Sequence, residues 1–211
     1  MNNSLQKILD NKVIAIIRGI SSKYILDTVQ ALSEGGVRCV EVTFNPKDED
    51  ASKDTLNSIE MIKTKFGEDV AVGAGTVLTI QNVLDASNAG AEYMISPNVN
   101  LEIIRKTKEI GCVSIPGALT PSEAVSAYDE GADIIKLFPA GVLGTEYVKA
   151  LVSPLNHILF AAVGGITPQN APEFITAGAI GVGVGGSLVS KTLIEAGEFD
   201  KIKQFASEFK L

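Results

Sequence analysis

A single lysine lies inside an apolar run in the second half of the chain. The run reads DIIKLFPAG, from Asp133 to Gly141, and it surrounds Lys136 with isoleucine, leucine and phenylalanine side chains. Apolar surroundings disfavour the charged ammonium form of a lysine. An uncharged amine can attack a carbonyl carbon and form a Schiff base. The sequence therefore predicts that Lys136 is a nucleophile.

A glutamate occupies a comparable position in the run VRCVEVTF. Because side chains alternate along a strand, Cys39, Glu41 and Thr43 are expected on one face, with the intervening valines on the other. A carboxyl group that faces Lys136 can act as a general acid or base. The alternative is a buried ion pair between Glu41 and Lys136 that only fills the interior.

Two glycine-rich turns suggest a phosphate ligand. They read AVGGIT at residues 162–167 and VGVGGSL at residues 182–188. Glycine turns expose backbone N–H groups, which bind phosphate oxygens when they lie beside a helix N-terminus. Arg18 offers a fork of donors that suits a carboxylate, and Thr76 offers a hydroxyl group. A surface salt bridge is the alternative for Arg18.

The elements that would position these residues repeat along the chain. Eight β-branched or alanine-rich runs, spaced by roughly 20 to 25 residues, occupy residues 13–17, 37–42, 70–74, 91–96, 112–117, 132–138, 157–165 and 179–186. Near-continuous apolar strands are typical of a parallel sheet that is buried on both faces. Alternation with eight helical stretches predicts an α/β fold, a single TIM (β/α)8 barrel, over residues 1–211. A doubly wound open sheet is the alternative.

Helix signals lie between these strands. The stretch 22–36 carries apolar residues at helical spacing and ends in Gly35-Gly36. In TPSEAVSAYDEGA, Thr120 is expected as the N-cap, with Pro121 at the first helical position and Glu123 completing a capping box. The stretch TPQNAPEFITAGA is expected to repeat this helix start at Thr167.

Composition excludes several kinds of partner. A net charge of −7 argues against nucleic acid. The sequence contains no apolar run of 18 residues and no secretory signal, so we expect a cytoplasmic protein without membrane contact. Cys39 and Cys112 are expected to be inert core residues. The only histidine, His157, is expected at the opposite end of the barrel from the site, so neither a metal site nor a cofactor is expected.

The chain resembles the class I aldolases of 2-keto-3-deoxy-6-phosphogluconate (KDPG) and 4-hydroxy-2-oxoglutarate (KHG). The resemblance runs nearly end to end and is carried by GGVRCVEVTF, VGAGTVL, ISPN, IPGALTPSE, IKLFPA, AVGGITPQN and GVGGSLV. It implies a homotrimeric TIM-barrel lyase of carbohydrate metabolism, of the Entner–Doudoroff type, that releases pyruvate and glyceraldehyde 3-phosphate. Its substrate would be a phosphorylated keto acid.

The resemblance also implies roles for single residues. Lys136 would be the Schiff-base lysine, and Glu41 would shuttle protons through water. The residues that would bind substrate are Arg18, Thr76, Pro97 and Phe138 at the pyruvate end, with Gly164, Gly165, Gly185, Gly186 and Ser187 at the phosphate end.

Departures from the family pattern leave alternatives. Asn45 stands where many phosphogluconate-type members have an arginine, so Arg18 is expected to bind the carboxylate instead. This combination, with AVGGIT, is closer to the related 2-keto-3-deoxy-6-phosphogalactonate aldolases. A phosphosugar epimerase would need a multi-histidine metal site, which one histidine cannot build. A non-catalytic sugar-phosphate-binding barrel is a further reading.

Overall fold

The computed structural model describes residues 3–211, in which short parallel strands form one ring. The order around the ring is β5-β4-β3-β2-β1-β9-β8-β7-β6. The strands are β1 (Val13–Ile17), β2 (Cys39–Thr43), β3 (Ala71–Gly75), β4 (Tyr93–Ile95), β5 (Val113–Ile115), β6 (Gly117–Ala118), β7 (Ile135–Leu137), β8 (Phe160–Val163) and β9 (Gly181–Val184).

The fifth expected strand is divided by a proline. Pro116 has no N–H group and separates β5 from β6. On one side of it Ile115 pairs with Ile95 of β4, and on the other Gly117 pairs with Lys136 of β7. The chain itself therefore closes the ring where the ladder is interrupted. The predicted TIM barrel is confirmed, and the open doubly wound sheet is wrong.

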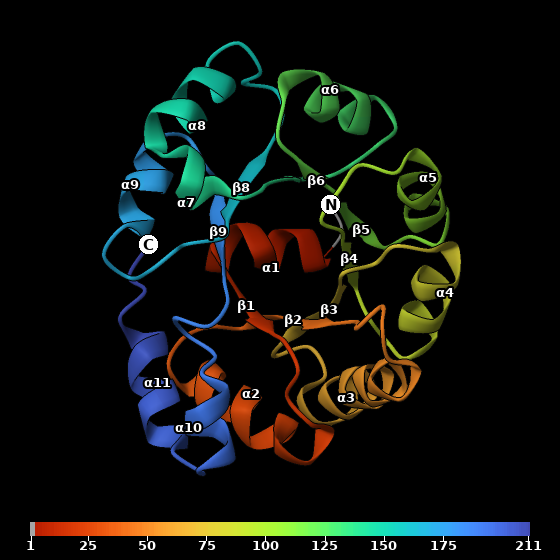
Figure 1. Cartoon of the computed structure of the whole chain (residues 1–211), viewed down its shortest axis with the longest axis vertical. Coiled ribbons are helices and arrows are strands. Elements are labelled where there is room, and N and C mark those ends of the chain that lie inside the picture. Colours follow the sequence, from red (N-terminus) through yellow and green to blue (C-terminus); the bar gives the residue numbers. More distant parts are fainter. Residues whose placement is uncertain (1–2) are drawn as a thin grey trace.

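Helices surround this ring on its outer side (Figure 1). The helices within residues 3–211 are α1 (Asn3–Asn11), η1 (Ser22–Tyr24), α2 (Ile25–Glu34), α3 (Glu49–Phe66), α4 (Ile80–Asn88), α5 (Leu101–Glu109), α6 (Pro121–Asp129), α7 (Ala140–Leu143), α8 (Thr145–Val152), α9 (Ala171–Thr176), α10 (Lys191–Glu195) and α11 (Phe199–Ser207). Only α1 departs from this arrangement, since it crosses the centre of the ring in this view.

The sequence signals for helix starts succeed at one position and fail at another. At α6, Thr120 caps the helix, Pro121 is the first helical residue and the capping box with Glu123 is formed, as predicted. The expected helix start at Thr167 is wrong, because α9 begins at Ala171. The Thr167 N–H instead donates to the Asn170 side chain at 2.8 Å, and this contact holds a turn ahead of the helix.

Side-chain alternation divides the buried residues into two cores. Cys39 and Ile134 belong to the core inside the ring. Val40, Val42 and Leu137 belong to the core between the strands and the outer helices. Burial of each such aliphatic side chain stabilises the folded state by about 1.5–3 kcal/mol. The predicted inward and outward faces of β2 are therefore confirmed at Cys39, Val40 and Val42, and β7 alternates in the same way.

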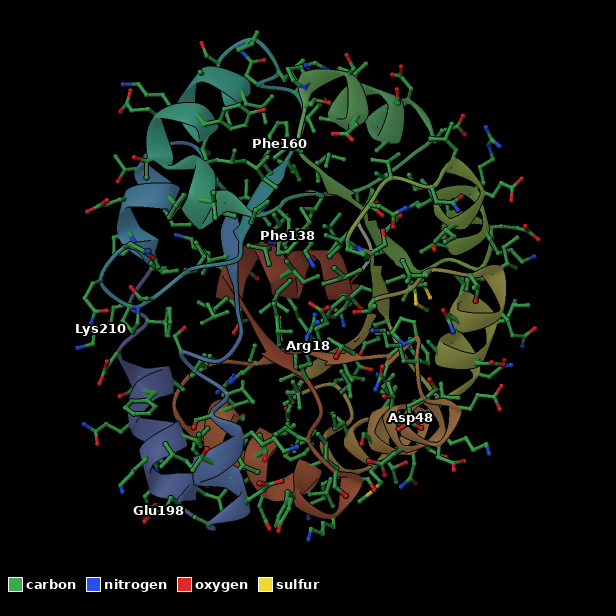
Figure 2. All side chains as sticks on the ribbon, viewed as in Figure 1. Arg18, Asp48, Phe138, Phe160, Glu198 and Lys210 are labelled. Carbon is green, nitrogen blue, oxygen red and sulfur yellow. The ribbon has the colours of Figure 1, made fainter. Side chains whose placement is uncertain are left out.

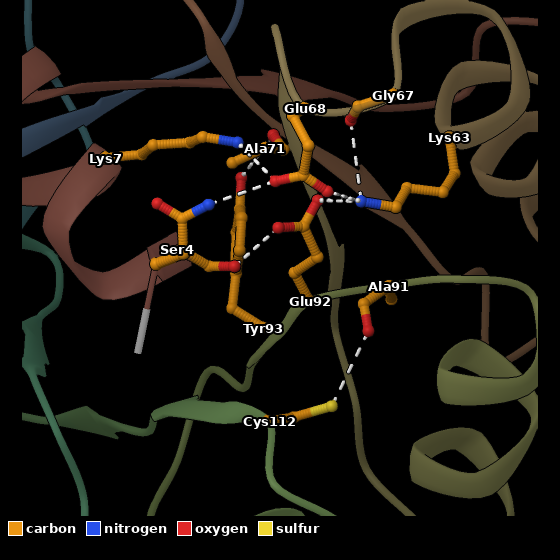
Figure 3. A network of polar contacts seen from close by, with 11 residues as sticks. Ser4, Lys7, Lys63, Gly67, Glu68, Ala71, Ala91, Glu92, Tyr93 and Cys112 are labelled. Atoms are coloured by element: carbon orange, nitrogen blue, oxygen red, sulfur yellow. Dashed lines mark hydrogen bonds and ion pairs between the residues drawn. The ribbon is translucent and has the colours of Figure 1, made fainter. Parts of the chain in front are cut away.

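Helix α1 closes the N-terminal end of the barrel, which the sequence did not predict. Ile8 packs into the inner core, with Leu5 beside it, and α1 contacts β1, β2, β3 and β9. A polar network fixes the helix from outside (Figure 3): Lys7 pairs with Glu68 at 3.2 Å, and Ser4 donates to Glu92. The interior therefore opens only at the other end of the strands.

Among the described residues 3–211, no helix has the length and apolar character needed to cross a membrane.

Candidate active site

Lys136 is the middle residue of β7, inside the ring. It is 6% exposed, and its Nζ lies 5.2 Å from the centre of the Phe138 ring. It lines a cavity of about 620 Å³ at the open end of the barrel. The neighbouring inward residue, Ile134, is 1% exposed and lies deeper in the core. The fold thus places one primary amine at the boundary between an apolar interior and a ligand-sized space.

This cavity, called the main cavity below, brings together most of the residues predicted from the sequence. Figure 2 shows Arg18 and Phe138 near the centre of the ring. The predicted residues that line the main cavity are Arg18, Thr76, Pro97, Lys136, Phe138, Gly164, Gly165, Gly185, Gly186 and Ser187. They come from loops far apart in the sequence, as expected at the C-terminal ends of barrel strands.

Glu41 does not line the main cavity. It is 2% exposed in β2, and burial raises the pKa of its carboxyl group above the ordinary value, while the positive charges of Lys136 and Arg18 oppose that rise. Within residues 3–211, no ion pair joins Glu41 to Lys136. The direct ion pair, which was the alternative for these residues, is therefore not found there. Burial instead favours the protonated carboxyl group.

Gly75 of β3 leaves space for the Glu41 carboxyl group, because glycine has no side chain. A Cβ atom at Gly75 would lie 1.7 Å from Glu41 Oε1, and one at Gly73 would lie 2.1 Å from the Tyr93 ring. Tyr93 is fully buried, and its hydroxyl group donates to the Val40 carbonyl oxygen. The alternating glycines of AVGAG are the signal for this arrangement. Sequence reasoning missed it because the neighbours of β3 were unknown.

Arg18 and Thr76 stand at one end of the main cavity. Arg18 is exposed and, within residues 3–211, forms no ion pair, so the surface salt bridge is not found. Thr76 has a backbone φ of 57°, which is strained for a β-branched residue. Such strain costs about 1–3 kcal/mol and concentrates at functional sites.

Two glycine loops also line the main cavity. Gly164 and Gly165 have φ values of 91° and 75°, so their backbone geometry explains these glycines. Gly185 and Gly186 have no such φ value, and a Cβ atom at either would meet nothing within 4 Å. Neither backbone conformation nor packing requires glycine at these two positions. Close approach of a ligand to the backbone would explain glycine at these two positions. The Ser187 hydroxyl group donates to the Ile166 carbonyl oxygen at 2.7 Å.

A second cavity of about 440 Å³ adjoins the first and is called the α3 cavity here. Arg18 and Thr76 line both cavities. Thr43 lines the α3 cavity, and it is 5% exposed with a buried hydroxyl oxygen that has no hydrogen-bond partner. The other lining residues are Ile17, Gly19, Ile20, Ser21, Val42, Phe44, Asn45, Pro46, Ala51, Asp54 and Thr55.

Metal-ligand geometry is not present in the part of the chain that the structure describes. No three histidine, cysteine, aspartate or glutamate side chains gather there in a group that could hold a metal ion. Cys39 and Cys112 are both buried, and burial raises the pKa of the Cys39 thiol to about 12.

Known proteins resemble this chain over most of its length. The family model described as "Aldolase: KDPG and KHG aldolase" matches residues 5–205. The 2-dehydro-3-deoxy-6-phosphogalactonate aldolase of Escherichia coli (strain K12) is 35% identical over 196 residues, covering 90% of this chain and 93% of that protein. The 2-dehydro-3-deoxy-phosphogluconate aldolase of Treponema pallidum (strain Nichols) is 34% identical over 183 residues, covering 85% and 82%.

A solved structure covers almost the whole chain. The KDPG aldolase from Legionella pneumophila, crystallised with pyruvate captured at low pH as a covalent carbinolamine intermediate, superposes with a TM-score of 0.87 at 26% identity. The match covers 99% of this chain and 98% of that one.

Proposed function

The chain belongs to the KDPG and KHG aldolase family, and from that membership we propose that it cleaves KDPG to pyruvate and glyceraldehyde 3-phosphate through a Schiff base on Lys136. KHG is a further substrate of the same site. The observation that carries the proposal is the placement of Lys136, which is 6% exposed and faces a cavity of about 620 Å³ that ends in two glycine loops.

The reaction begins at the keto carbon. The Lys136 amine attacks C2, and loss of water leaves a protonated imine. A base then removes the C4 hydroxyl proton, the C3–C4 bond breaks, and its electron pair flows into the imine to give an enamine. Glyceraldehyde 3-phosphate leaves, C3 takes up a proton, and water hydrolyses the imine to release pyruvate and free Lys136.

Glu41 is the proposed acid and base, acting through water. Burial raises the pKa of its carboxyl group, which brings it toward the range where one group can both take up and release a proton. Because Glu41 does not line the main cavity, a water molecule has to connect it to the C4 hydroxyl group. Replacing Glu41 with glutamine should lower turnover by roughly 10² to 10⁴, while imine formation persists. Full activity of this variant would contradict the proposed role.

The substrate's two charged ends fit the two ends of the main cavity. Arg18 and Thr76 are proposed to bind the keto-acid carboxylate, and Pro97 and Phe138 to shape the pyruvate end. The backbone N–H groups of the glycine loops, with Ser187 beside them, are proposed to bind the phosphate group. No metal ion or cofactor takes part in this scheme.

The test is borohydride trapping. Incubation with pyruvate and borohydride should reduce the imine and leave one covalent adduct on the peptide that contains Lys136, as read by mass spectrometry. Lys136→Met should remove the adduct. An unmodified protein would instead favour a non-catalytic sugar-phosphate-binding barrel, and an adduct on another lysine would refute the assignment.

Cleavage of the galactonate epimer in addition to KDPG is the second candidate function. It is favoured by Asn45, by Arg18, which has no ion-pair partner within residues 3–211, and by the 35% identical phosphogalactonate aldolase of Escherichia coli. If one or two hydrogen bonds of about 1 kcal/mol each discriminate the C4 epimers, both phosphogluconate- and phosphogalactonate-derived acids should be cleaved. Arg18→Ala should impair both. A kcat/KM preference above about 10⁴ would contradict this expectation.

The assembly, location and extent of the protein are also proposals. Leu119 follows β6 and Val142 lies on α7; they are 41% and 84% exposed, which favours burial against other copies. We propose a cytoplasmic homotrimer with one barrel domain over residues 1–211, acting in an Entner–Doudoroff type of carbohydrate metabolism. Sedimentation equilibrium should give three times the chain mass of 22.2 kDa, and a monomer would refute the assembly.

A further inference from the structure

The α3 cavity lies beyond the proposed carboxylate end of the main cavity. Arg18 and Thr76 line both spaces, so they stand at the junction between them. If Lys136 bonds to C2 and the sugar chain extends toward the glycine loops, then C1 of the keto acid points to this junction. The inference therefore rests on the proposed function, and it concerns what lies past C1.

The space past C1 is large enough for a further group and is partly apolar. About 440 Å³ is within the range of small-molecule sites. Ile17, Val42 and Phe44 supply apolar wall on the strand side, and Ala51 lines the cavity from the first turn of α3. A short alkyl group would replace water at this wall.

A polar group without a partner also lines the α3 cavity. The Thr43 hydroxyl oxygen is buried and accepts and donates no hydrogen bond within residues 3–211. A buried hydroxyl group without a partner is unfavourable. Ser58, on α3, has the only other such side-chain oxygen in this part of the chain, and it does not line the cavity. Thr43, unlike Ser58, therefore lies beside the α3 cavity with a hydroxyl group that lacks a hydrogen-bond partner within residues 3–211.

The charges of the cavity favour a neutral group over a second anion. Arg18 at the junction has no ion-pair partner among the described residues and is exposed, so it can swing aside. Asp54 also lines the cavity, and its Oδ2 accepts the Ser22 N–H at 3.0 Å. Its carboxylate repels a second carboxylate and accepts hydrogen bonds from an amide N–H.

We propose that the α3 cavity takes the C1 substituent of uncharged 2-oxo amides and esters, so that the enzyme forms imines with carbonyl donors larger than pyruvate. The Lys136 amine bonds to C2, and the C2 oxygen leaves as water, as with pyruvate. The alkyl group past C1 lies against the apolar wall, and the Thr43 hydroxyl group hydrogen-bonds the amide or ester group.

N-propylpyruvamide, which resists hydrolysis to pyruvate, is the probe. The protein is incubated with pyruvate or with the amide, reduced with borohydride and digested. The expected result is an adduct on the Lys136 peptide with each donor, the two differing in mass by the propylamide group. Pyruvate trapping without amide trapping overturns the inference. Trapping with neither donor overturns the Schiff-base proposal and this inference together.

Variants that fill the α3 cavity test whether this space, and not the main cavity, holds the alkyl group of the amide. Ala51→Phe should lower the amide adduct by at least about tenfold relative to the pyruvate adduct, whose yield also reports that the variant is folded. Ala51→Leu serves the same purpose with a smaller side chain. Lys53→Phe adds the same ring to the same helix at a side chain that is 74% exposed, and should change neither adduct. An amide adduct that survives in both Ala51 variants overturns the inference.

The hydroxyl group is tested by a matched pair. Thr43→Val keeps the side-chain shape and should slow amide trapping several-fold, whereas Thr43→Ser should restore it. Ser58→Ala removes the other unpartnered hydroxyl group and should have no effect on either adduct. Equal amide trapping in the wild type and in Thr43→Val would remove Thr43 from the proposal.

Discussion

Replacing Gly75 with alanine should displace the Glu41 carboxyl group from its position beneath the main cavity. The added Cβ atom would lie 1.7 Å from Oε1 and 2.5 Å from Cδ, whereas ordinary contacts begin at 3.4 Å. The carboxyl oxygen must therefore retreat by about 1.7 Å. Misplacing a reacting group by about 1 Å lowers rates by about 10²-fold, so we expect kcat to fall by roughly 10² to 10³.

Stability and imine formation should respond differently. Overpacking of this kind costs about 1–3 kcal/mol in the free energy of unfolding, which is measured by urea unfolding. Lys136 lies on β7, across the ring from Gly75, so pyruvate trapping should persist. The kinetic measurement is a coupled assay of aldehyde release. A Gly75→Ala enzyme with unchanged kcat would refute the reasoning.

Two further variants identify the cause. In a Glu41→Ala background, Gly75→Ala should cost no additional activity and little stability, because the side chain that it strikes is gone. Gly35→Ala is the matched control, since its Cβ atom would lie 2.4 Å from Ala206 on α11, far from the site. That variant should lose stability without losing kcat. An equal loss of kcat in both would mean that general destabilisation, not displacement of Glu41, is responsible.

Three further predictions follow from the same geometry. Because burial raises the pKa of Glu41, its contribution to stability is fully present below the unfolded pKa and is lost as pH rises through the folded pKa. Urea unfolding should therefore show Glu41→Gln gaining stability over the wild type with rising pH. A stability difference that stays constant with pH would contradict this. Thr76→Gly should raise the free energy of unfolding by about 1 kcal/mol by relieving the positive φ, while keto-acid KM rises; a less stable variant would be the wrong outcome. Gly186→Ala, with no atom in its way, should unfold within about 0.5 kcal/mol of the wild type yet raise KM for the phosphorylated substrate about tenfold or more, and unchanged KM would place the phosphate elsewhere.

The barrel could be predicted from the sequence because parallel strands buried on both faces leave a continuous apolar pattern. Loops meet at the C-terminal ends of barrel strands, and this rule alone predicted that Arg18, Lys136 and Gly185 line one cavity, as the structure shows. Period-2 alternation was enough to separate Cys39 from Val40. These successes depend on local pattern and on chain order only.

What escaped prediction depends on contacts between elements. The glycine that accommodates Glu41 is visible only once the register of β2 and β3 is known, since Thr43 pairs with Gly75. The apolar face of α1 is short and carried no sign of which end of the barrel it covers. At Thr167 the cap contacts do form, since the Thr167 N–H donates to the Asn170 side chain and the Asn170 N–H donates to the Thr167 hydroxyl group, but they close a turn ahead of α9 instead of its first turn. The unpartnered Thr43 hydroxyl group has no signature in sequence.

Because α1 closes the N-terminal end of the barrel, the reactivity of the Cys39 thiol reports how often α1 detaches. Its thiol is 0% exposed beneath α1, in the same core cluster as Ile8, and burial raises its pKa to about 12. Thiol reagents react with the thiolate, so labelling has to wait until α1 lifts and water reaches the sulfur. The labelling rate of Cys39 in the intact protein therefore measures how often α1 detaches, without any engineered reporter. Ligands at the opposite end of the barrel can be ranked by how much they lower this labelling rate.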